Sequence, residues 1–184
     1  MDKEEFLNEL KDFWIKNDVP NISKINAKFI RDLIKIQKTK NMLEIGTANW
    51  FSTINFAIEL EKTEWHIYSI EFSPHSFAEA ENNIKSVWLE NSVTLIQWNA
   101  LDEIWKFENS FFDFIFIDWM KKRSKDFLDL SWPKLKNNWI LIIDDVIKFR
   151  DKMSSLWIYL DENEFKYNII PIDIDDWILM IIKD

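Results

Sequence analysis

The sequence predicts an α/β domain built on a doubly wound, mostly parallel sheet of seven strands. Short runs that are nearly continuous in Ile, Leu and Phe alternate with longer segments of helical periodicity, which is typical of buried parallel strands covered by helices on both faces. The last two runs have no helix between them, so we expect them to pair antiparallel. We interpret residues 1–184 as one domain, with N-terminal helices in 1–38 and the core in 39–184.

The predicted strands are apolar runs of ordinary strand length that end at polar or turn residues. In chain order they are NMLEI (41–45), HIYSIE (66–71), SVTLIQ (92–97), FFDFIFID (111–118), WILIIDD (139–145) and the two halves of YNIIPIDIDDWILMIIKD (167–184). We expect the final two strands to be joined by a short turn at DDW, because they are otherwise continuous.

Helical spacing of apolar residues and N-terminal capping signals define the helices between these strands. Ser23 and Ser73 are expected to cap two of them, and Pro74 suits the first position of the second. The predicted helical segments are 2–16, 25–37, 51–62, 73–87, 121–135 and 150–162.

Composition excludes several classes of protein and site. The chain has no Cys, so disulfides, thiolate metal sites and a Cys nucleophile are excluded, and a cytoplasmic location is the expectation. Two His residues without matching spacing make a zinc site improbable. A formal charge of −9 argues against broad electrostatic binding of nucleic acid. No apolar stretch approaches the length of a membrane span, so we expect no membrane partner.

Acidic residues and the single glycine follow the predicted strands at their carboxyl ends, where a doubly wound sheet binds its ligand. The residues that end the first, second, fourth and fifth strands are Gly46, Glu71, Asp118 and the pair Asp144–Asp145. This order resembles the class I S-adenosylmethionine-dependent methyltransferases. Within them it is most similar to the metal-dependent O-methyltransferases that include catechol and caffeoyl-CoA enzymes. The resemblance covers roughly residues 20–184 and implies a Rossmann-like methyltransferase fold.

The resemblance implies that the loop LEIGTANWFST (43–53) and the next strand ends bind S-adenosylmethionine. Gly46 would let the backbone approach the methionine part, Ser52 would bind its carboxylate, and Glu71 would accept both ribose hydroxyls. Asn99 stands where the family usually has an Asp near the adenine. The full set of expected cofactor residues is Glu44, Gly46, Thr47, Trp50, Ser52, Glu71, Asn99 and Asp118.

The same resemblance implies a Mg²⁺ site and a general base. Asp118, Asp144 and Asp145 would supply the carboxylate oxygens that Mg²⁺ prefers, with Asp145 in place of the family's usual Asn. Lys121 matches the base that takes a proton from the acceptor hydroxyl, its pKa lowered by desolvation or by the metal. Taken singly, Lys121 also fits a solvated surface charge, and Asp144–Asp145 a turn or helix cap.

Three functions are compatible with these residues. The leading hypothesis is methyl transfer to a metal-bound hydroxyl of a small molecule. A second enzymatic hypothesis is methylation of hydroxylated uridine in tRNA, as in bacterial relatives of the family, although the low pI argues against it. The third is a methyltransferase-fold binding protein with an impaired cofactor site. The resemblance also allows a homodimer.

Glycine and tryptophan occur in abnormal numbers, with one Gly and 11 Trp. Several Trp residues stand where the family or the predicted turns demand glycine. We hypothesise that these are UGA codons that encode glycine and have been translated as tryptophan. A genuine Trp50 should instead obstruct the cofactor, and each left-handed Trp should cost about 1–2 kcal/mol. The principal positions are Trp50, Trp88, Trp98, Trp139 and Trp177.

Overall fold

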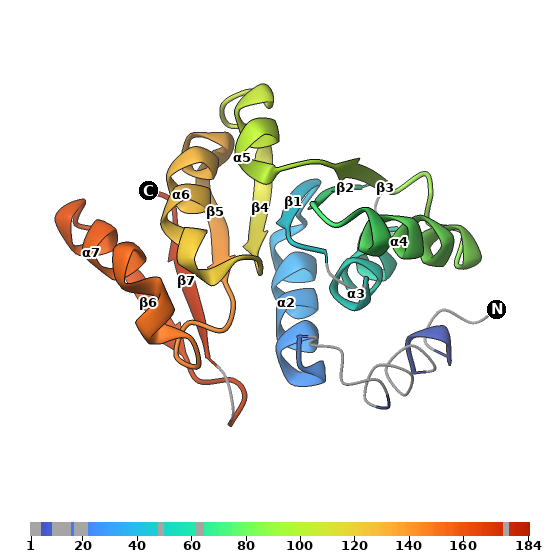
Figure 1. Cartoon of the computed structure of the whole chain (residues 1–184), viewed down its shortest axis with the longest axis horizontal. Helices are drawn as coiled ribbons and strands as arrows, with labels where there is room; N and C mark the ends of the chain where they lie inside the picture. The colour runs from blue at the N-terminus through green and yellow to red at the C-terminus, as the bar shows by residue number, and fades with distance from the viewer. Residues whose placement is uncertain (1–4, 9–15, 17–21, 48–49, 62–64, 175–176) are drawn as a thin grey trace.

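The computed structural model describes residues 5–8, 16, 22–47, 50–61, 65–174 and 177–184 (Figure 1). Its centre is a seven-stranded sheet in the order β3-β2-β1-β4-β5-β7-β6. The strands are β1 (Asn41–Ile45), β2 (His66–Glu71), β3 (Val93–Gln97), β4 (Phe112–Ile117), β5 (Leu135–Ile143), β6 (Tyr167–Ile170) and β7 (Ile178–Ile182). The first five strands pair in parallel, and β7 lies antiparallel between β5 and β6. The predicted fold class is confirmed.

In the described part of the chain, helix α2 precedes the first strand, and helices α3 to α7 with several short 3-10 helices connect the strands. Ser23 and Ser73 cap α2 and α4 as predicted, each hydroxyl oxygen accepting a hydrogen bond from a backbone N–H three residues later. The predicted helix at 2–16 lies mostly outside the described residues. The helices are α2 (Lys24–Gln37), α3 (Phe51–Leu60), α4 (Pro74–Ser86), α5 (Ala100–Glu103), α6 (Ser124–Ser131) and α7 (Ser154–Glu162); the 3-10 helices are η2 (Ile104–Lys106), η3 (Lys121–Arg123), η4 (Trp132–Lys134) and η5 (Arg150–Met153).

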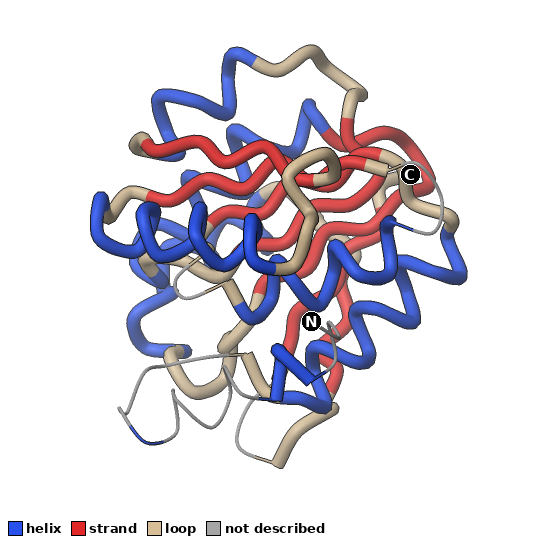
Figure 2. Tube along the Cα trace, turned by 90° about the vertical axis from the view of Figure 1, so that its right-hand side faces the viewer, coloured by secondary structure: helices blue, strands red, loops and turns tan. Residues whose placement is uncertain are grey.

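Helices cover both faces of the sheet, as Figure 2 shows, and each face has its own apolar core. Successive side chains of a strand point to opposite faces, so β4 supplies Phe114 and Phe116 to the core under α2, α3 and α4. Its alternate residues Ile115 and Ile117 pack into the core under α5, α6 and α7. None of the described helices is long and apolar enough to span a membrane.

Strands β2 and β3 lie on one side of β1, and β4 and β5 lie on its other side. The order of the strands therefore reverses between the neighbours β1 and β4. Backbone hydrogen bonds extend the parallel pairing past the strand ends: Asp118 N donates to Ile45 O at 2.9 Å, and Asp144 N donates to Ile117 O at 3.0 Å. The residues that follow β1, β4 and β5 therefore meet at one edge of the sheet, at the topological switch point where such folds bind ligands.

Some predicted element boundaries are wrong. Strand β6 ends at Ile170 and β7 begins at Ile178, so the connection between these antiparallel strands is longer than predicted; the expected turn at DDW falls partly on residues 175–176, which lie outside the described part. Strand β5 begins four residues before the predicted start, at Leu135. Helix α5 was not predicted, because its four residues are too few to show helical periodicity.

The five principal Trp positions divide into two groups. Trp50 (φ 75°) and Trp88 (φ 58°) have the left-handed backbone that favours glycine. Trp98, Trp139 and Trp177 do not have a positive φ, and beside Trp139 the left-handed residue is Asn138, with φ 67°. The expectation of a glycine-demanding backbone is therefore confirmed at two of the five positions.

Candidate active site

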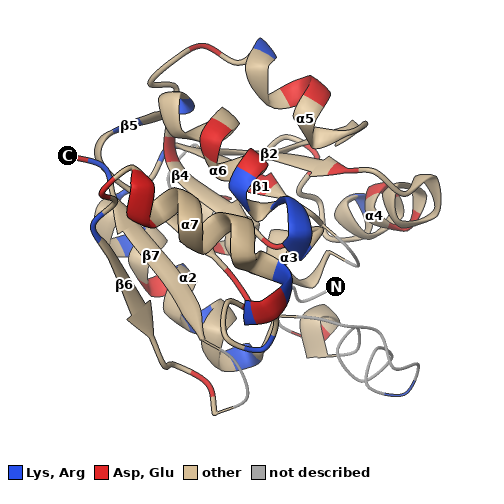
Figure 3. Cartoon of the chain, turned by 60° about the vertical axis from the view of Figure 1, so that its left-hand side comes forward, with Lys and Arg blue, Asp and Glu red and all other residues tan. Residues whose placement is uncertain are grey.

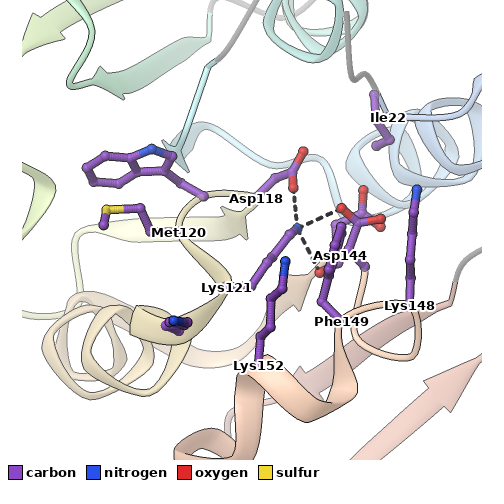
Figure 4. Close-up of a pocket in the computed structure, with 11 residues that line it drawn as sticks. Ile22, Asp118, Met120, Lys121, Asp144, Lys148, Phe149 and Lys152 are labelled. Atoms are coloured by element: carbon purple, nitrogen blue, oxygen red, sulfur yellow. Dashed lines mark hydrogen bonds and ion pairs between the residues drawn. The ribbon is translucent and has the colours of Figure 1, made fainter. Parts of the chain in front are cut away.

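A cavity of about 530 Å³ lies at the carboxyl ends of β4 and β5 (Figure 4). Its walls come from the segment after β4, the segment after β5, η5 and Ile22, which precedes α2. The predicted residues Asp118, Lys121, Asp144 and Asp145 all line it, so residues from two separate strand ends meet in one place.

Lys121 is the central group of this cavity. The backbone turns at Met120, whose φ is 30°, and η3 then directs the Lys121 side chain inward. Its ammonium donates to Asp118 Oδ1 at 2.5 Å and to the backbone oxygen of Asp144 at 3.1 Å. It also lies 3.0 Å from Asp145 Oδ2. With 14% of its side chain exposed, Lys121 is not a solvated surface charge.

The charges around Lys121 perturb one another. Burial, together with the negative charge of the neighbouring Asp118, raises the pKa of Asp144 to about 8. The pKa of Asp118 is also raised, first by burial, although Lys121 opposes the shift. Burial lowers the pKa of Lys121, but the three aspartates outweigh it and the net pKa lies above the ordinary value. The expected lowering of the Lys121 pKa is thus not found with these groups alone.

The side chains of this cavity are of the types that bind a divalent cation, but they are not arranged as a ready metal site. In the described part of the chain, no three acidic or imidazole side chains converge as a ready metal group, because the Lys121 ammonium lies against Asp118 and Asp145. Three carboxylates nevertheless face one ammonium, and hard oxygen donors are what Mg²⁺ prefers. Asn26, which sequence reasoning missed, adds a buried amide oxygen without a hydrogen-bond partner; its amide nitrogen donates to Asp144 Oδ1 at 3.4 Å.

The predicted cofactor loop follows β1 and rests on a buried carboxylate. Glu44 is fully buried and accepts hydrogen bonds from the hydroxyls of Thr53 and Ser69. The Ser52 side chain also hydrogen-bonds Glu44, and Thr47 shares a 2.7 Å hydrogen bond with Ser69. The side chains of Glu44 and Thr47 are thus engaged in hydrogen bonds that hold this segment, and their contact with the cofactor stays a prediction; residues 48–49 lie outside the described part.

Two residues of this loop have unusual backbone requirements. Gly46 has φ 89°, and a Cβ there would lie 2.5 Å from Trp119 Cβ and 2.6 Å from Asp118 O, so no side chain fits. Trp50 caps α3 in a left-handed conformation, and its indole is fully buried. Its Nε1 donates to Ser76 O at 2.9 Å, so the indole packs toward α4.

The other two predicted cofactor residues lie at neighbouring strand ends. The Glu71 carboxylate, at the end of β2, accepts hydrogen bonds from Thr47 N at 3.3 Å and Ser73 N at 2.7 Å. The structure thus brings Glu71 to the β1 loop. Asn99 follows β3 and caps α5, where its Oδ1 accepts a hydrogen bond from Leu101 N at 3.1 Å.

Comparison with known proteins identifies relatives of the whole arrangement. A family model described as O-methyltransferase matches residues 1–154. A catechol O-methyltransferase from Niastella koreensis is 28% identical over 131 residues, which are 70% of this chain and 59% of that protein. A tapetum-specific methyltransferase from Arabidopsis thaliana is 26% identical, over 79% of this chain and 65% of its own length. The chain thus matches less than two thirds of these curated relatives.

Solved structures share the fold. A Staphylococcus aureus protein described as a caffeoyl-CoA O-methyltransferase superimposes with a TM-score of 0.85 at 27% identity, covering 96% of this chain and 91% of that chain. An O-methyltransferase from Bacillus cereus superimposes with a TM-score of 0.84 at 22% identity, covering 97% and 91%.

Proposed function

Because the chain belongs to the O-methyltransferase family, we propose that it transfers the methyl group of S-adenosylmethionine to a hydroxyl group of a small molecule. The observation that carries this proposal is the Lys121 ammonium, which contacts Asp118 and Asp145 inside a cavity at the switch point of the sheet. The carboxylates that would hold a cation and the amine that would act as the base thus lie together at the place where such a sheet binds its ligand.

The cofactor would bind along the ends of β1 and β2. Glu71 is held by two backbone amides and would accept the ribose hydroxyls, while Gly46 leaves room for close approach of the methionine part. Ser52 and Asn99 remain proposed contacts, and both now have intramolecular hydrogen bonds that the cofactor would compete with. Asp118 would mark the boundary between the cofactor and the acceptor.

Asp118, Asp144 and Asp145 would hold the divalent cation, and the amide oxygen of Asn26 lies beside them. When bound there, Mg²⁺ would lower the pKa of an acceptor hydroxyl and of the Lys121 ammonium. The chain's own part is then to position the acceptor and to take its proton. The hydroxyl proton passes to Lys121 Nζ and the hydroxyl oxygen bonds to the methyl carbon. The electron pair of the broken carbon–sulfur bond stays on sulfur.

A methyl-transfer assay on the chain with glycine at position 50 tests this proposal, with catechol as acceptor, S-adenosylmethionine and Mg²⁺. The variant Lys121→Met keeps the length of the side chain but removes the amine, and we expect a loss of rate of about 100-fold or more. Lys125→Met is the matched control, because Lys125 pairs with Asp129 outside the cavity. Equal rates for the two variants would contradict the role of Lys121, and absence of transfer by every form would contradict the proposed activity.

We also propose that glycine is encoded at Trp50 and Trp88. Their left-handed backbones support this, since a Cβ is unfavourable there by about 1–2 kcal/mol. Trp88 is 75% exposed, so its side chain gains little from packing in return. For Trp98, Trp139 and Trp177 the proposal rests on the sequence alone.

A further inference from the structure

The outer part of the cavity is lined by three lysines that have no role in the proposed methyl transfer. Lys122, Lys148 and Lys152 are all exposed, and no carboxylate of the described residues forms an ion pair with them. Lys121, in contrast, is engaged with the aspartates deeper in the site. Figure 4 shows the Lys148 and Lys152 side chains extending beside Phe149 and Lys121.

The Phe149 ring is an apolar surface beside the ammonium groups of Lys148, Lys152 and Lys121. The ammonium groups of Lys148 and Lys152 lie 5.6 and 4.8 Å from the centre of its ring, and that of Lys121 lies 5.9 Å away. Phe149 itself lines the cavity. A ligand that enters therefore meets an aromatic face with cations at its edge.

This arrangement is exceptional for the molecule. Acidic residues outnumber basic ones over the whole chain, which has a formal charge of −9, and charges of both signs occur along its length (Figure 3). The cavity has the opposite balance, with four lysines and three aspartates in its lining. Lys122, Lys148 and Lys152, which form no ion pair with the described residues, lie in a concave site of an acidic protein, where they attract anions and raise their local concentration.

We propose that the acceptor carries a carboxylate or phosphate group, which Lys148 and Lys152 bind while its apolar part packs against Phe149. Lys122 adds to the positive potential at the same opening. This inference rests on the proposed function, because it names the class of hydroxyl compound that the same site would methylate. A cavity of about 530 Å³ has the size of small-molecule sites, which favours a small acceptor over a nucleic acid.

Calorimetric binding with three probes that share one ring tests the inference without catalysis. The probes are catechol, 3,4-dihydroxybenzoate and dopamine, which carry no charge, a carboxylate and an ammonium group respectively. With the full chain and Mg²⁺ at low salt, we expect the carboxylate probe to bind about tenfold more tightly than catechol, and dopamine to bind more weakly. Because screening weakens exposed pairs, 0.5 M NaCl should reduce the preference to about twofold.

Variants assign the preference to the two lysines. Lys148→Ala/Lys152→Ala should bring the carboxylate and neutral probes to nearly equal affinity, and Lys148→Glu/Lys152→Glu should favour dopamine. Lys148→Arg/Lys152→Arg should keep the preference for the carboxylate. The control Lys85→Ala/Lys166→Ala makes the same change of net charge at exposed positions outside this cavity and should also keep it.

Three results would overturn the inference: equal affinity for the three probes, undetectable binding of the carboxylate probe, or tight salt-dependent binding of tRNA that the double alanine variant abolishes. Binding of S-adenosylmethionine is measured separately, on the chain with glycine at position 50. Absence of cofactor binding would contradict the proposed methyl transfer. The relative affinities of the three probes would still show whether the cavity prefers an anionic ligand, so failure of the proposed function and failure of this inference are distinguishable.

Discussion

The substitution Glu44→Gln should change how the stability of the protein depends on pH. Glu44 lies in β1 beneath the cofactor loop, with no exposed surface. Burial raises its pKa from 4.5 to about 7, although hydrogen bonds from Ser52, Thr53 and Ser69 act in the opposite direction. One carboxylate oxygen, Oε1, has no hydrogen-bond partner and is therefore the natural place for a proton.

The sign and size of the effect follow from linkage. Between pH 4.5 and about 7 the folded state keeps a proton on Glu44 that the unfolded state has lost. The free energy of unfolding therefore falls as pH rises through this window and levels off above it. A difference from 4.5 to about 7 corresponds to about 3 kcal/mol, at about 1.4 kcal/mol per pH unit.

Urea denaturation of the parent protein and of Glu44→Gln at pH 5, 6, 7 and 8 measures this contribution. Gln does not titrate, so the free energy of unfolding of the variant should fall by about 2.5 kcal/mol less between pH 5 and pH 8, since part of the window lies below pH 5. The buried Asp144 adds a similar slope, but it is present in both proteins and cancels in the comparison. Glu108→Gln, at an exposed position, controls for the lost charge. Parallel pH profiles for the parent and Glu44→Gln would refute the reasoning.

Three other predictions concern the cation site, the sheet and the tryptophans. Asp144→Asn removes a carboxylate whose pKa is raised to about 8, so it should raise the melting temperature at pH 8.5. The same variant should bind Mg²⁺ at least about tenfold more weakly by calorimetry, and unchanged Mg²⁺ affinity would contradict the proposal that Asp144 is a Mg²⁺ ligand. Asp113→Ala should lower the free energy of unfolding by about 2–5 kcal/mol. The reason is that the buried Asp113 carboxylate accepts hydrogen bonds from two backbone N–H groups and pairs with Lys136. A loss below about 1 kcal/mol in urea denaturation would argue against this anchoring. Trp88→Gly should raise the free energy of unfolding by about 1 kcal/mol and Trp98→Gly should not, since of these two residues only Trp88 has a left-handed backbone. Equal effects of the two substitutions would contradict the claim that the backbone at position 88 favours glycine.

The fold was largely predictable because its signals are local. Apolar runs of strand length alternate with helical segments, and this alternation alone predicts a parallel sheet with both faces covered. The caps at Ser23 and Ser73 follow from residue type at the start of a periodic segment. The long connection from Ile170 to Ile178 was missed because Ile172 and Ile174 continue the apolar alternation of the strand past Pro171.

The three aspartates and Lys121 were predictable as a group, whereas Asn26 and the outer lysines were not. Asp118 and Asp144 follow strands that are neighbours in a parallel sheet, so their meeting is a consequence of topology. Asn26 reaches the same place from α2, and no pattern within the sequence pairs it with a residue 118 positions away. Lys148 and Lys152 lie four residues apart and follow the predicted strand 139–145, which ends in two site aspartates. This spacing was the one available signal for the cationic part of the cavity.

The direction of side chains in the cofactor loop also depends on tertiary contacts. Glu44 and Thr47 belong to the predicted cofactor segment, and their side chains turn toward Thr53 and Ser69. Residue type and spacing identify the loop but do not say which of its polar groups are used to hold it in shape.

Calorimetric titration of S-adenosylmethionine into the full chain with glycine at position 50 tests the central claim most directly. The variant Trp50→Gly should keep its circular dichroism spectrum and bind one cofactor with a Kd below about 1 mM, while the Trp50 form binds more weakly. Glu71→Ala should abolish binding in the glycine form, because it removes the carboxylate proposed to hold the ribose. A folded Trp50→Gly protein that gives no binding heat and retains no cofactor in equilibrium dialysis would contradict the assignment as a methyltransferase.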